Sequence, residues 1–259
     1  MDLAYTAAGL AVGFIVGLTG VGGGSLMTPL LVLAFGISPA IAVGTDLLYA
    51  AITKSGGSWV HARRGSVNWK VAGLLAAGSI PASLVTTAVL KYLAPDVHDL
   101  STLITTMLGV ALILTAGALL FKDRLRGLAR ERVSHRHGWS RHTTSIITVA
   151  MGLVLGVLVT ISSVGAGALG AAMLFFLYPR LTSVQIIGTD IVHAVPLTAV
   201  AGLGHVALGS VDWSLLGALL LGSLPGIYLG SHLAVKIPER VLRPTLAAML
   251  VLIGGKLVF

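Results

Sequence analysis

The sequence predicts an all-α polytopic membrane protein with two pseudo-symmetric repeats, expected to be inverted, whose helices break at glycine-rich segments. Three observations support this fold class: 56% hydrophobic residues against 10% charged ones, a mean hydropathy of +0.96 and an internal repeat. A soluble domain carries about 25% charged residues. A chain this apolar cannot cover its surface with polar groups, so we expect a lipid bilayer around it.

Long apolar runs predict the membrane helices in order along the chain. Several approach the roughly 20 residues that a helix needs to cross a bilayer. They lack the alternation of polar and apolar residues that is typical of a transmembrane barrel. The 33 glycines fit a helix bundle, because small residues let membrane helices approach closely. The runs are 3–16, 71–90, 103–121, 146–161, 215–233 and 242–259.

The basic residues that give the chain a formal net charge of +8 gather between the apolar runs, above all in 122–142. Cytoplasmic loops of membrane proteins carry an excess of Lys and Arg. We therefore expect 122–142 to be a cytoplasmic loop between a first repeat, 1–121, and a second repeat, 143–259. Contact with anionic lipid is the alternative for this segment, and the charge does not indicate nucleic-acid binding.

An internal repeat relates the second half of the chain to the first. Gly165 follows Gly22 by 143 positions and Asp190 follows Asp46 by 144, so one residue is inserted between the two motifs. The agreement extends well beyond shared hydrophobicity. Matched segments include Val21, Gly22, Gly24 and Leu26 with Val164, Gly165, Gly167 and Leu169, Gly44-Thr45-Asp46 with Gly188-Thr189-Asp190, His61 with His205, 65–69 with 209–213, and 78–81 with 222–225.

Each repeat is predicted to hold five segments, the first two meeting at a glycine-rich break. An odd number of crossings makes the repeats inverted, and loop charge agrees: 61–65 is basic whereas its counterpart 205–209 has no Lys or Arg. The next pair of loops has the opposite bias, with 94–99 lacking basic residues and 236–243 carrying three. If each glycine break instead lies within a single crossing, the repeats are parallel.

The two glycine-rich breaks are the predicted anion site. A helix that begins after such a break presents unpaired N–H groups and the positive end of its dipole, and broken helices at mid-membrane sites recur in secondary transporters. Close helix crossing is the structural alternative for these glycines. The predicted substrate-binding residues are Thr19, Gly22, Gly23, Gly24, Ser25, Ser162, Ser163, Gly165 and Gly167, with Gln185 as a further polar side chain.

Asp46 and Asp190 are the carboxylates well inside apolar segments, and both end a Gly-Thr-Asp motif. A charged group in a membrane is costly and marks a functional position by default. Proton coupling is the functional interpretation, because protonation removes repulsion against an anionic substrate. The structural alternative is that each carboxylate caps a helix or binds backbone amides.

Two further residues are grouped with the carboxylates as coupling candidates. Lys54 follows Asp46 by eight residues on the same predicted helix face and pairs with substrate or extends to the cytoplasmic edge. His193 follows Asp190 by three residues and titrates or packs as a neutral side chain. His61 and His205 adjoin turns, where solvated positions are expected.

Several other chemistries find no support in the residues. The chain has no cysteine, its His, Asp and Glu show no metal-ligand spacing, and no serine triad can be assembled. The glycines are not followed by Lys-Ser or Lys-Thr, as a nucleotide-binding loop requires. We therefore expect neither a cofactor nor a metal, and no catalytic residues.

The doubled pattern, GLTGVGGGSLMTPLL with GTDLL and SSVGAGALGAAML with GTDIV, resembles the sulfite exporter TauE/SafE family of membrane permeases over essentially the whole chain. The resemblance implies a multi-pass secondary transporter of the bacterial inner membrane for small sulfur-containing anions, such as sulfite or organosulfonates. Ala166 stands where the first repeat has Gly23, which questions an equal contribution of the two breaks. The matching motif positions are Gly22, Gly24, Asp46, Gly165, Gly167 and Asp190.

Together these observations predict ion- or proton-coupled alternating access of a small anion to a site between the two repeats. Three alternatives stay open: an anion channel, a transporter of another small organic anion, and an intramembrane enzyme that uses Asp46 and Asp190 as a dyad. The sequence lacks the charged rings or repeated filter of a channel.

Overall fold

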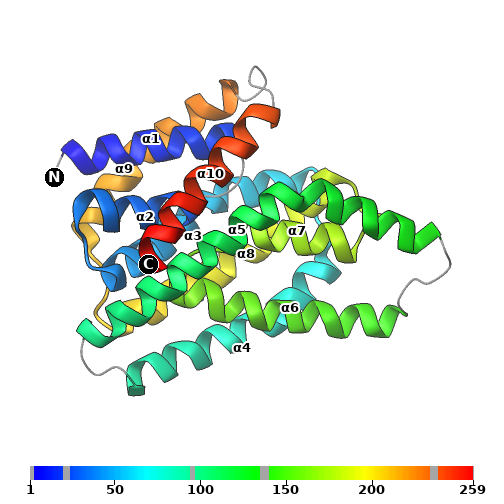
Figure 1. The fold of residues 1–259 in the computed structure, drawn as a ribbon, viewed down its shortest axis with the longest axis horizontal. Helices are drawn as coiled ribbons and strands as arrows, with labels where there is room; N and C mark the ends of the chain where they lie inside the picture. The colour runs from blue at the N-terminus through cyan, green and yellow to red at the C-terminus, as the bar shows by residue number, and fades with distance from the viewer. Residues whose placement is uncertain (1–2, 20–23, 94–96, 135–139, 234–238, 259) are drawn as a thin grey trace.

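The computed structural model describes residues 3–19, 24–93, 97–134, 140–233 and 239–258, which form helices joined by short connections. The described residues contain ten helices, five in each half of the chain (Figure 1). They are α1 (Leu3–Thr19), α2 (Gly24–Phe35), α3 (Pro39–Arg63), α4 (Trp69–Leu93), α5 (Val97–Ser134), α6 (Arg141–Ser162), α7 (Ala168–Leu177), α8 (Ser183–Ala207), α9 (Trp213–Leu233) and α10 (Glu239–Val258).

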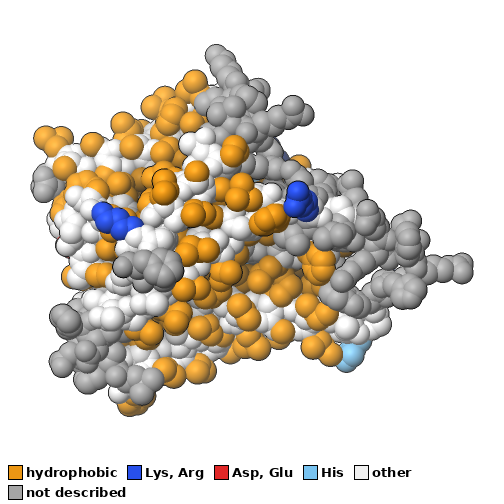
Figure 2. All heavy atoms as spheres, in the orientation of Figure 1, with side chains coloured by type: hydrophobic (Ala, Val, Ile, Leu, Met, Phe, Trp, Pro, Cys, Tyr) orange, Lys and Arg blue, Asp and Glu red, His pale blue; other side chains and the backbone are white. Residues whose placement is uncertain are grey.

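The helices have the length and surface of a membrane protein. Within the described ranges, five of them contain a stretch long and apolar enough to cross a bilayer. Large apolar side chains such as Leu84 and Leu224 are more than half exposed, and Figure 2 shows hydrophobic side chains over much of the face that it draws. The predicted all-α membrane fold is confirmed. The five stretches are Trp69–Tyr92, Ser101–Phe121, Arg141–Ser162, Ser183–Ala207 and Trp213–Leu233.

The segment 122–142 is helical over most of its length. Helix α5 runs for 38 residues and continues to Ser134, whereas its apolar stretch ends at Phe121. A helix of this length spans about 57 Å at 1.5 Å per residue, well beyond a hydrocarbon core of about 30 Å. The residues after Phe121 include four Arg, two Leu, one Lys and one Glu, which favour helix even outside a membrane.

Each half places its first helix against the fourth helix of the other half. Helix α1 packs on α9 and α6 packs on α4, and Figure 1 shows these pairs on opposite sides of a central group that includes α3 and α8. In the α1–α9 pair, a Cβ on Gly222 would collide with the carbonyl oxygen of Thr6. Glycine spacing of four residues on both helices produces this close approach: Gly9, Gly13 and Gly17 lie on α1, and Gly222, Gly226 and Gly230 on α9.

The central helices α3 and α8 are equivalent in the repeat and pack antiparallel. The backbone of Gly44, near the start of α3, lies against Ser210, just after α8. At the other end of the pair, Gly188 near the start of α8 lies against Ser66, just after α3. The first residue of each Gly-Thr-Asp motif is therefore a contact point between the halves.

The threonines of the same motifs bind the helix hairpin turns of the opposite half. Thr45 Oγ1 accepts a hydrogen bond from the N–H of Asp212 at 3.1 Å, and Thr189 Oγ1 accepts one from the N–H of Asn68 at 2.9 Å. The two bonds are related by the repeat. This reciprocal contact is independent structural evidence of the duplication.

The histidines beside these turns stabilise the turns themselves. The His205 ring is fully buried. Its Nδ1 lies 2.8 Å from Ser210 Oγ, and its Nε2 lies 2.8 Å from Thr160 O. The expected solvated position for His205 is wrong, because a backbone carbonyl of α6 reaches the ring. The equivalent His61 makes the matching 2.8 Å contact with Ser66 and is half-buried.

Candidate functional site

Asp46 and Asp190 are buried at the centre of the helix bundle. Asp46 is fully buried on α3, and its Oδ2 accepts a hydrogen bond of 2.5 Å from Thr28 Oγ1 on α2. Asp190 on α8 is 2% exposed, and its carboxylate lies so close to Gly170 on α7 that a Cβ there would collide with it. In each half, the helix that follows the glycine-rich break thus meets the carboxylate of its own Gly-Thr-Asp motif.

Lys54 points into the bundle rather than to its edge. Its Nζ donates a 2.8 Å hydrogen bond to the carbonyl oxygen of Ala166, in the second glycine-rich break. The ammonium also interacts electrostatically with Asp190 and Asp46. The interpretation that Lys54 extends to the cytoplasmic edge is therefore wrong. Inside the protein, the ammonium is therefore partnered by a carbonyl that lies 112 residues away in the sequence and by two carboxylates.

The second break has the geometry expected of a helix start open to a ligand. Three residues between α6 and α7 have positive φ: Ser163 at 57°, Gly165 at 121° and Gly167 at 134°. The first backbone donors of α7 are Gly170, to the Gly165 carbonyl, and Ala171, to the Gly167 carbonyl. The N–H groups that precede them have no intrahelical acceptor, as at any helix start.

The two serines of this break have different roles. Ser162 Oγ donates to Leu158 O at 2.6 Å and accepts from the N–H of Val164 at 3.2 Å, so it closes the end of α6. Ser163 lies beside Asp46, yet its buried hydroxyl makes no well-formed hydrogen bond within the described chain. Of these two serines, Ser163 is the one whose hydroxyl faces Asp46 instead of the end of α6.

The first break is described only at its ends. Helix α1 ends at Thr19, whose side chain is not described, and α2 begins at Gly24. Ser25 is buried at the start of α2. The predicted ligands Gly22 and Gly23 lie outside the described residues.

Two other predicted residues are engaged elsewhere. Gln185 forms a capping box with Thr182 at the start of α8, where Gln185 Oε1 accepts from the Thr182 N–H at 3.1 Å. Its side chain therefore serves the helix start, and the predicted ligand role has no geometric support. His193 is 1% exposed, and its Nε2 lies 2.8 Å from Ser79 Oγ on α4.

Unpaired polar atoms concentrate around the carboxylates and Lys54. Within the described residues, six buried side-chain atoms lack a hydrogen-bond partner, and five of them belong to α3, α8 or the second break. Buried polar atoms are nearly always satisfied, so a cluster of exceptions indicates a missing water, ion or ligand. The five are Asp46 Oδ1, Tyr49 Oη, Ser163 Oγ, Asp190 Oδ1 and His193 Nδ1.

Tyr49 was not among the residues predicted from sequence. It is fully buried and belongs to the same core cluster as Met27 of α2 and Val164 of the second break. The repeat contained the signal, because His193 follows Tyr49 by the same 144 positions that separate the two aspartates.

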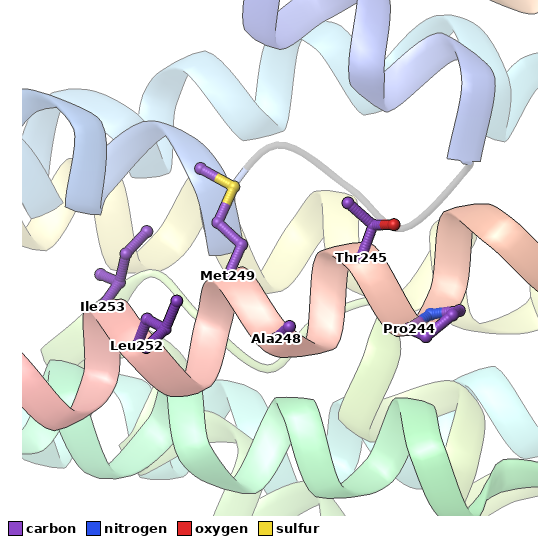
Figure 3. A pocket seen from close by; sticks show the side chains of 6 residues that line it. All are labelled: Pro244, Thr245, Ala248, Met249, Leu252 and Ile253. Carbon is purple, nitrogen blue, oxygen red and sulfur yellow. The ribbon is translucent and has the colours of Figure 1, made fainter.

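An apolar groove along α10 does not suit an anion. It has a volume of about 730 Å³, and Figure 3 shows its lining residues along this one helix. The side chains offer a single hydroxyl and no charge. They are Pro244, Thr245, Ala248, Met249, Leu252 and Ile253.

The fold and the site define a helical, multi-pass membrane protein with a charged centre built from both of its halves. Residues 5–257 match the family described as sulfite exporter TauE/SafE, and the chain belongs to this family. It is a membrane transporter of the TauE/SafE type.

Curated relatives agree with this assignment. The chain is 38% identical over 262 residues to "Probable membrane transporter protein YjnA" of Bacillus subtilis (strain 168), with 100% of both chains covered. It is 29% identical to "Probable membrane transporter protein YdhB" of the same organism, covering 93% of this chain and 96% of the relative. A "Probable membrane transporter protein" of Xylella fastidiosa (strain Temecula1 / ATCC 700964) is 26% identical, with 87% and 82% covered. No solved structure matches the chain.

Proposed function

We propose that the chain is a secondary transporter that moves small sulfur-containing anions, such as sulfite or organosulfonates, across the bacterial inner membrane by alternating access. The family description supports the substrate class. The burial of Asp46 and Asp190 inside the helix bundle supports a site within the membrane.

One observation carries the proposal: the Lys54 ammonium lies at the break before α7, among unpaired buried polar atoms. An anion placed there meets a positive charge, the positive end of a helix dipole and N–H groups without intrahelical acceptors. The Ser163 hydroxyl adds a donor. These are the groups that replace the hydration shell of an oxyanion.

The charges around the site support proton coupling. Two carboxylates and one ammonium carry a net negative charge when all are ionised, which opposes an anion. One proton bound to Asp46 or Asp190 removes this repulsion. The expected cycle therefore moves a proton together with the anion.

The antiparallel packing of α3 and α8 supports inverted repeats, since equivalent helices that run in opposite directions across a membrane have inverted topology. The natural chain has no cysteine, so single cysteines report sidedness directly. The equivalent variants Arg64→Cys and Leu208→Cys should be labelled from opposite sides in oriented vesicles. Labelling of both from one side would show parallel repeats.

Sulfite flux into proteoliposomes tests the site. Valine at Gly165, where φ is 121°, cannot keep the backbone of the break, so Gly165→Val should reduce flux to background. Ser163→Ala leaves the helices intact and should lower the apparent affinity. Gly73→Val, at an exposed helical glycine with open space around it, is the matched control. Wild-type flux in both site variants would contradict the proposal.

The same assay addresses coupling and the channel alternative. Asp46→Asn or Asp190→Asn should flatten the pH dependence of flux, and an unchanged profile in both variants would remove proton coupling. A transporter gives saturable flux and counterflow of labelled sulfite. Unsaturable flux without counterflow would identify an anion channel instead.

A further inference from the structure

We propose that Tyr49 and His193 are a pair of substrate-binding residues, one from each repeat, that hold an oxyanion from two sides of Lys54. The inference rests on the proposed function and adds two specific ligands to that site. It assigns them the role of recognising oxygen atoms of a sulfite or sulfonate group.

The two residues occupy the same position in the two repeats. Each follows the aspartate of its Gly-Thr-Asp motif by three residues, so each lies one helical turn beyond that carboxylate. Tyr49 is fully buried and His193 is 1% exposed. The repeat thus places a hydrogen-bonding side chain at this point of both central helices.

Their neighbours in the opposite repeat are equivalent as well. His193 Nε2 lies 2.8 Å from Ser79 Oγ on α4, and the Tyr49 hydroxyl is close to Ser223 on α9, although it forms no well-aligned hydrogen bond there. Ser223 follows Ser79 by 144 positions. The environments correspond, although one side chain is a phenol and the other an imidazole.

Each of the two residues has one polar atom without a partner within the described part of the chain, Tyr49 Oη and His193 Nδ1. An unpaired hydroxyl or ring nitrogen in a membrane interior is unfavourable, since no water is present to bind it. Phenylalanine or leucine would fill the same space without that cost. A ligand oxygen at the site accounts for both atoms.

Both residues lie at the charged centre. Tyr49 packs with Val164 of the second break, and it interacts electrostatically with Asp46. His193 interacts electrostatically with Lys54, whose Nζ binds Ala166 of the same break. Tyr49 is therefore near Asp46 and the second break, and His193 is near Lys54 on the side of α4.

The hydrogen-bond roles are consistent with an oxyanion. When the Ser79 hydroxyl donates to His193 Nε2, the ring proton sits on Nδ1 and is available to a ligand. The Tyr49 hydroxyl is a second neutral donor, and the Lys54 ammonium contributes charge. Three donors from three side chains match a group that presents several oxygen atoms.

Tyr49→Phe separates a ligand role from a structural one. Because the hydroxyl has no partner, removing it should leave the ligand-free melting temperature unchanged or slightly higher. The apparent KM for sulfite should rise about tenfold to a hundredfold, the effect of losing a hydrogen bond to a charged group. The sulfite-induced rise in melting temperature should shrink in parallel.

His193→Gln and Tyr178→Phe complete the test. Glutamine keeps a polar atom near Nε2 for Ser79 but offers none at Nδ1, so the KM for sulfite should rise with little change in ligand-free stability. The Tyr178 hydroxyl lies 2.7 Å from Thr148 Oγ1, so Tyr178→Phe should lower stability and leave KM unchanged. This control shows what a structural tyrosine does.

Two results would overturn the inference. If Tyr49→Phe melts at a lower temperature without ligand and keeps the wild-type KM, the hydroxyl is structural. If both variants keep wild-type KM and sulfite-induced stabilisation, the pair does not bind the anion, while the proposed function stands. A wild-type protein that shows neither sulfite flux nor stabilisation would instead refute the proposed function, and the pair with it.

Discussion

The two halves of the molecule share the contacts at their helix turns but differ in the residues at the buried centre. Both use a histidine–serine contact to close the turn after the third helix, and both use the threonine of Gly-Thr-Asp to bind the opposite turn. At the site, however, Lys54 has Thr198 as its counterpart, 144 positions later. Thr28, which binds Asp46, has Ala171 as its counterpart at the first motif offset.

The contacts that both repeats share hold the halves together. The residues that differ between equivalent positions, in contrast, shape the binding centre. A single small anion needs one cationic partner, and two lysines at equivalent positions would repel each other near the middle of the membrane. Thr198 instead returns its hydroxyl to the carbonyl oxygen of Ala194 at 2.8 Å. The second half therefore carries a neutral side chain at the position equivalent to Lys54.

Disrupting the close packing of α1 against α9 should have the largest effect on folding. Gly222→Val puts a side chain where the α1 backbone lies, at the carbonyl oxygen of Thr6, so we expect little or no folded protein. Size-exclusion chromatography of a fluorescent fusion would measure the amount of folded protein. Gly217→Val, on the same helix with open space around the glycine, should elute as wild type. A monodisperse Gly222→Val protein would show that the close α1–α9 contact is dispensable.

Removing the cation at the centre should have the next largest effect. Lys54→Met leaves two buried carboxylates without their shared positive charge, which costs about 3–5 kcal/mol of stability when one partner of a buried ionic group is removed. We expect sulfite flux in proteoliposomes to be lost. The exposed Lys70 provides the control, Lys70→Met, which should transport normally. Partial recovery of stability in the double variant Lys54→Met, Asp190→Asn would identify charge imbalance as the cause.

A smaller effect should follow from Thr28→Val. The variant removes the hydrogen bond to Asp46 Oδ2 and should lower the free energy of unfolding by about 1.5–3 kcal/mol, the range for bonds to charged groups. Thr115→Val, whose lost bond runs only to the Ala111 carbonyl of its own helix, should change it far less. If thermal unfolding shows equal losses of stability in the two variants, the Thr28–Asp46 bond contributes no more than a bond within one helix.

The smallest effect is expected for Gln185→Ala. Loss of one side of the capping box should lower stability by about 1 kcal/mol, and the KM for sulfite should not change because the side chain is bound at the start of α8. A changed KM with unaltered stability would restore the ligand role predicted from the sequence.

The sequence predicted the fold well because its signals are local. Continuous apolar runs mark helices, and the glycines before Ala168 mark the end of one helix and the start of another. The Thr182-Ser183-Val184-Gln185 sequence also carries a local capping-box signal, and the structure contains that capping box. Local chemistry alone therefore argues against a ligand role for Gln185.

The direction of Lys54 was beyond the reach of local reasoning. A lysine near the middle of a membrane helix extends to the nearest water unless an acceptor inside the bundle is closer. Here the acceptor is the Ala166 carbonyl, and only the packing of α3 against the second half brings it near. Tyr49 gives no local signal either, since a buried tyrosine usually finds a hydrogen-bond partner.

The exchanged packing of the first helices also sets an order of events during synthesis. Helix α9 begins 194 residues after α1 ends, on the order of 10 to 40 seconds of translation at about 5–20 residues per second. Over that interval the glycine face of α1 stays in the bilayer without its partner, while α4 meets α6 much sooner. The nascent protein therefore closes from its middle outward, and its first helix is among the last to find its place.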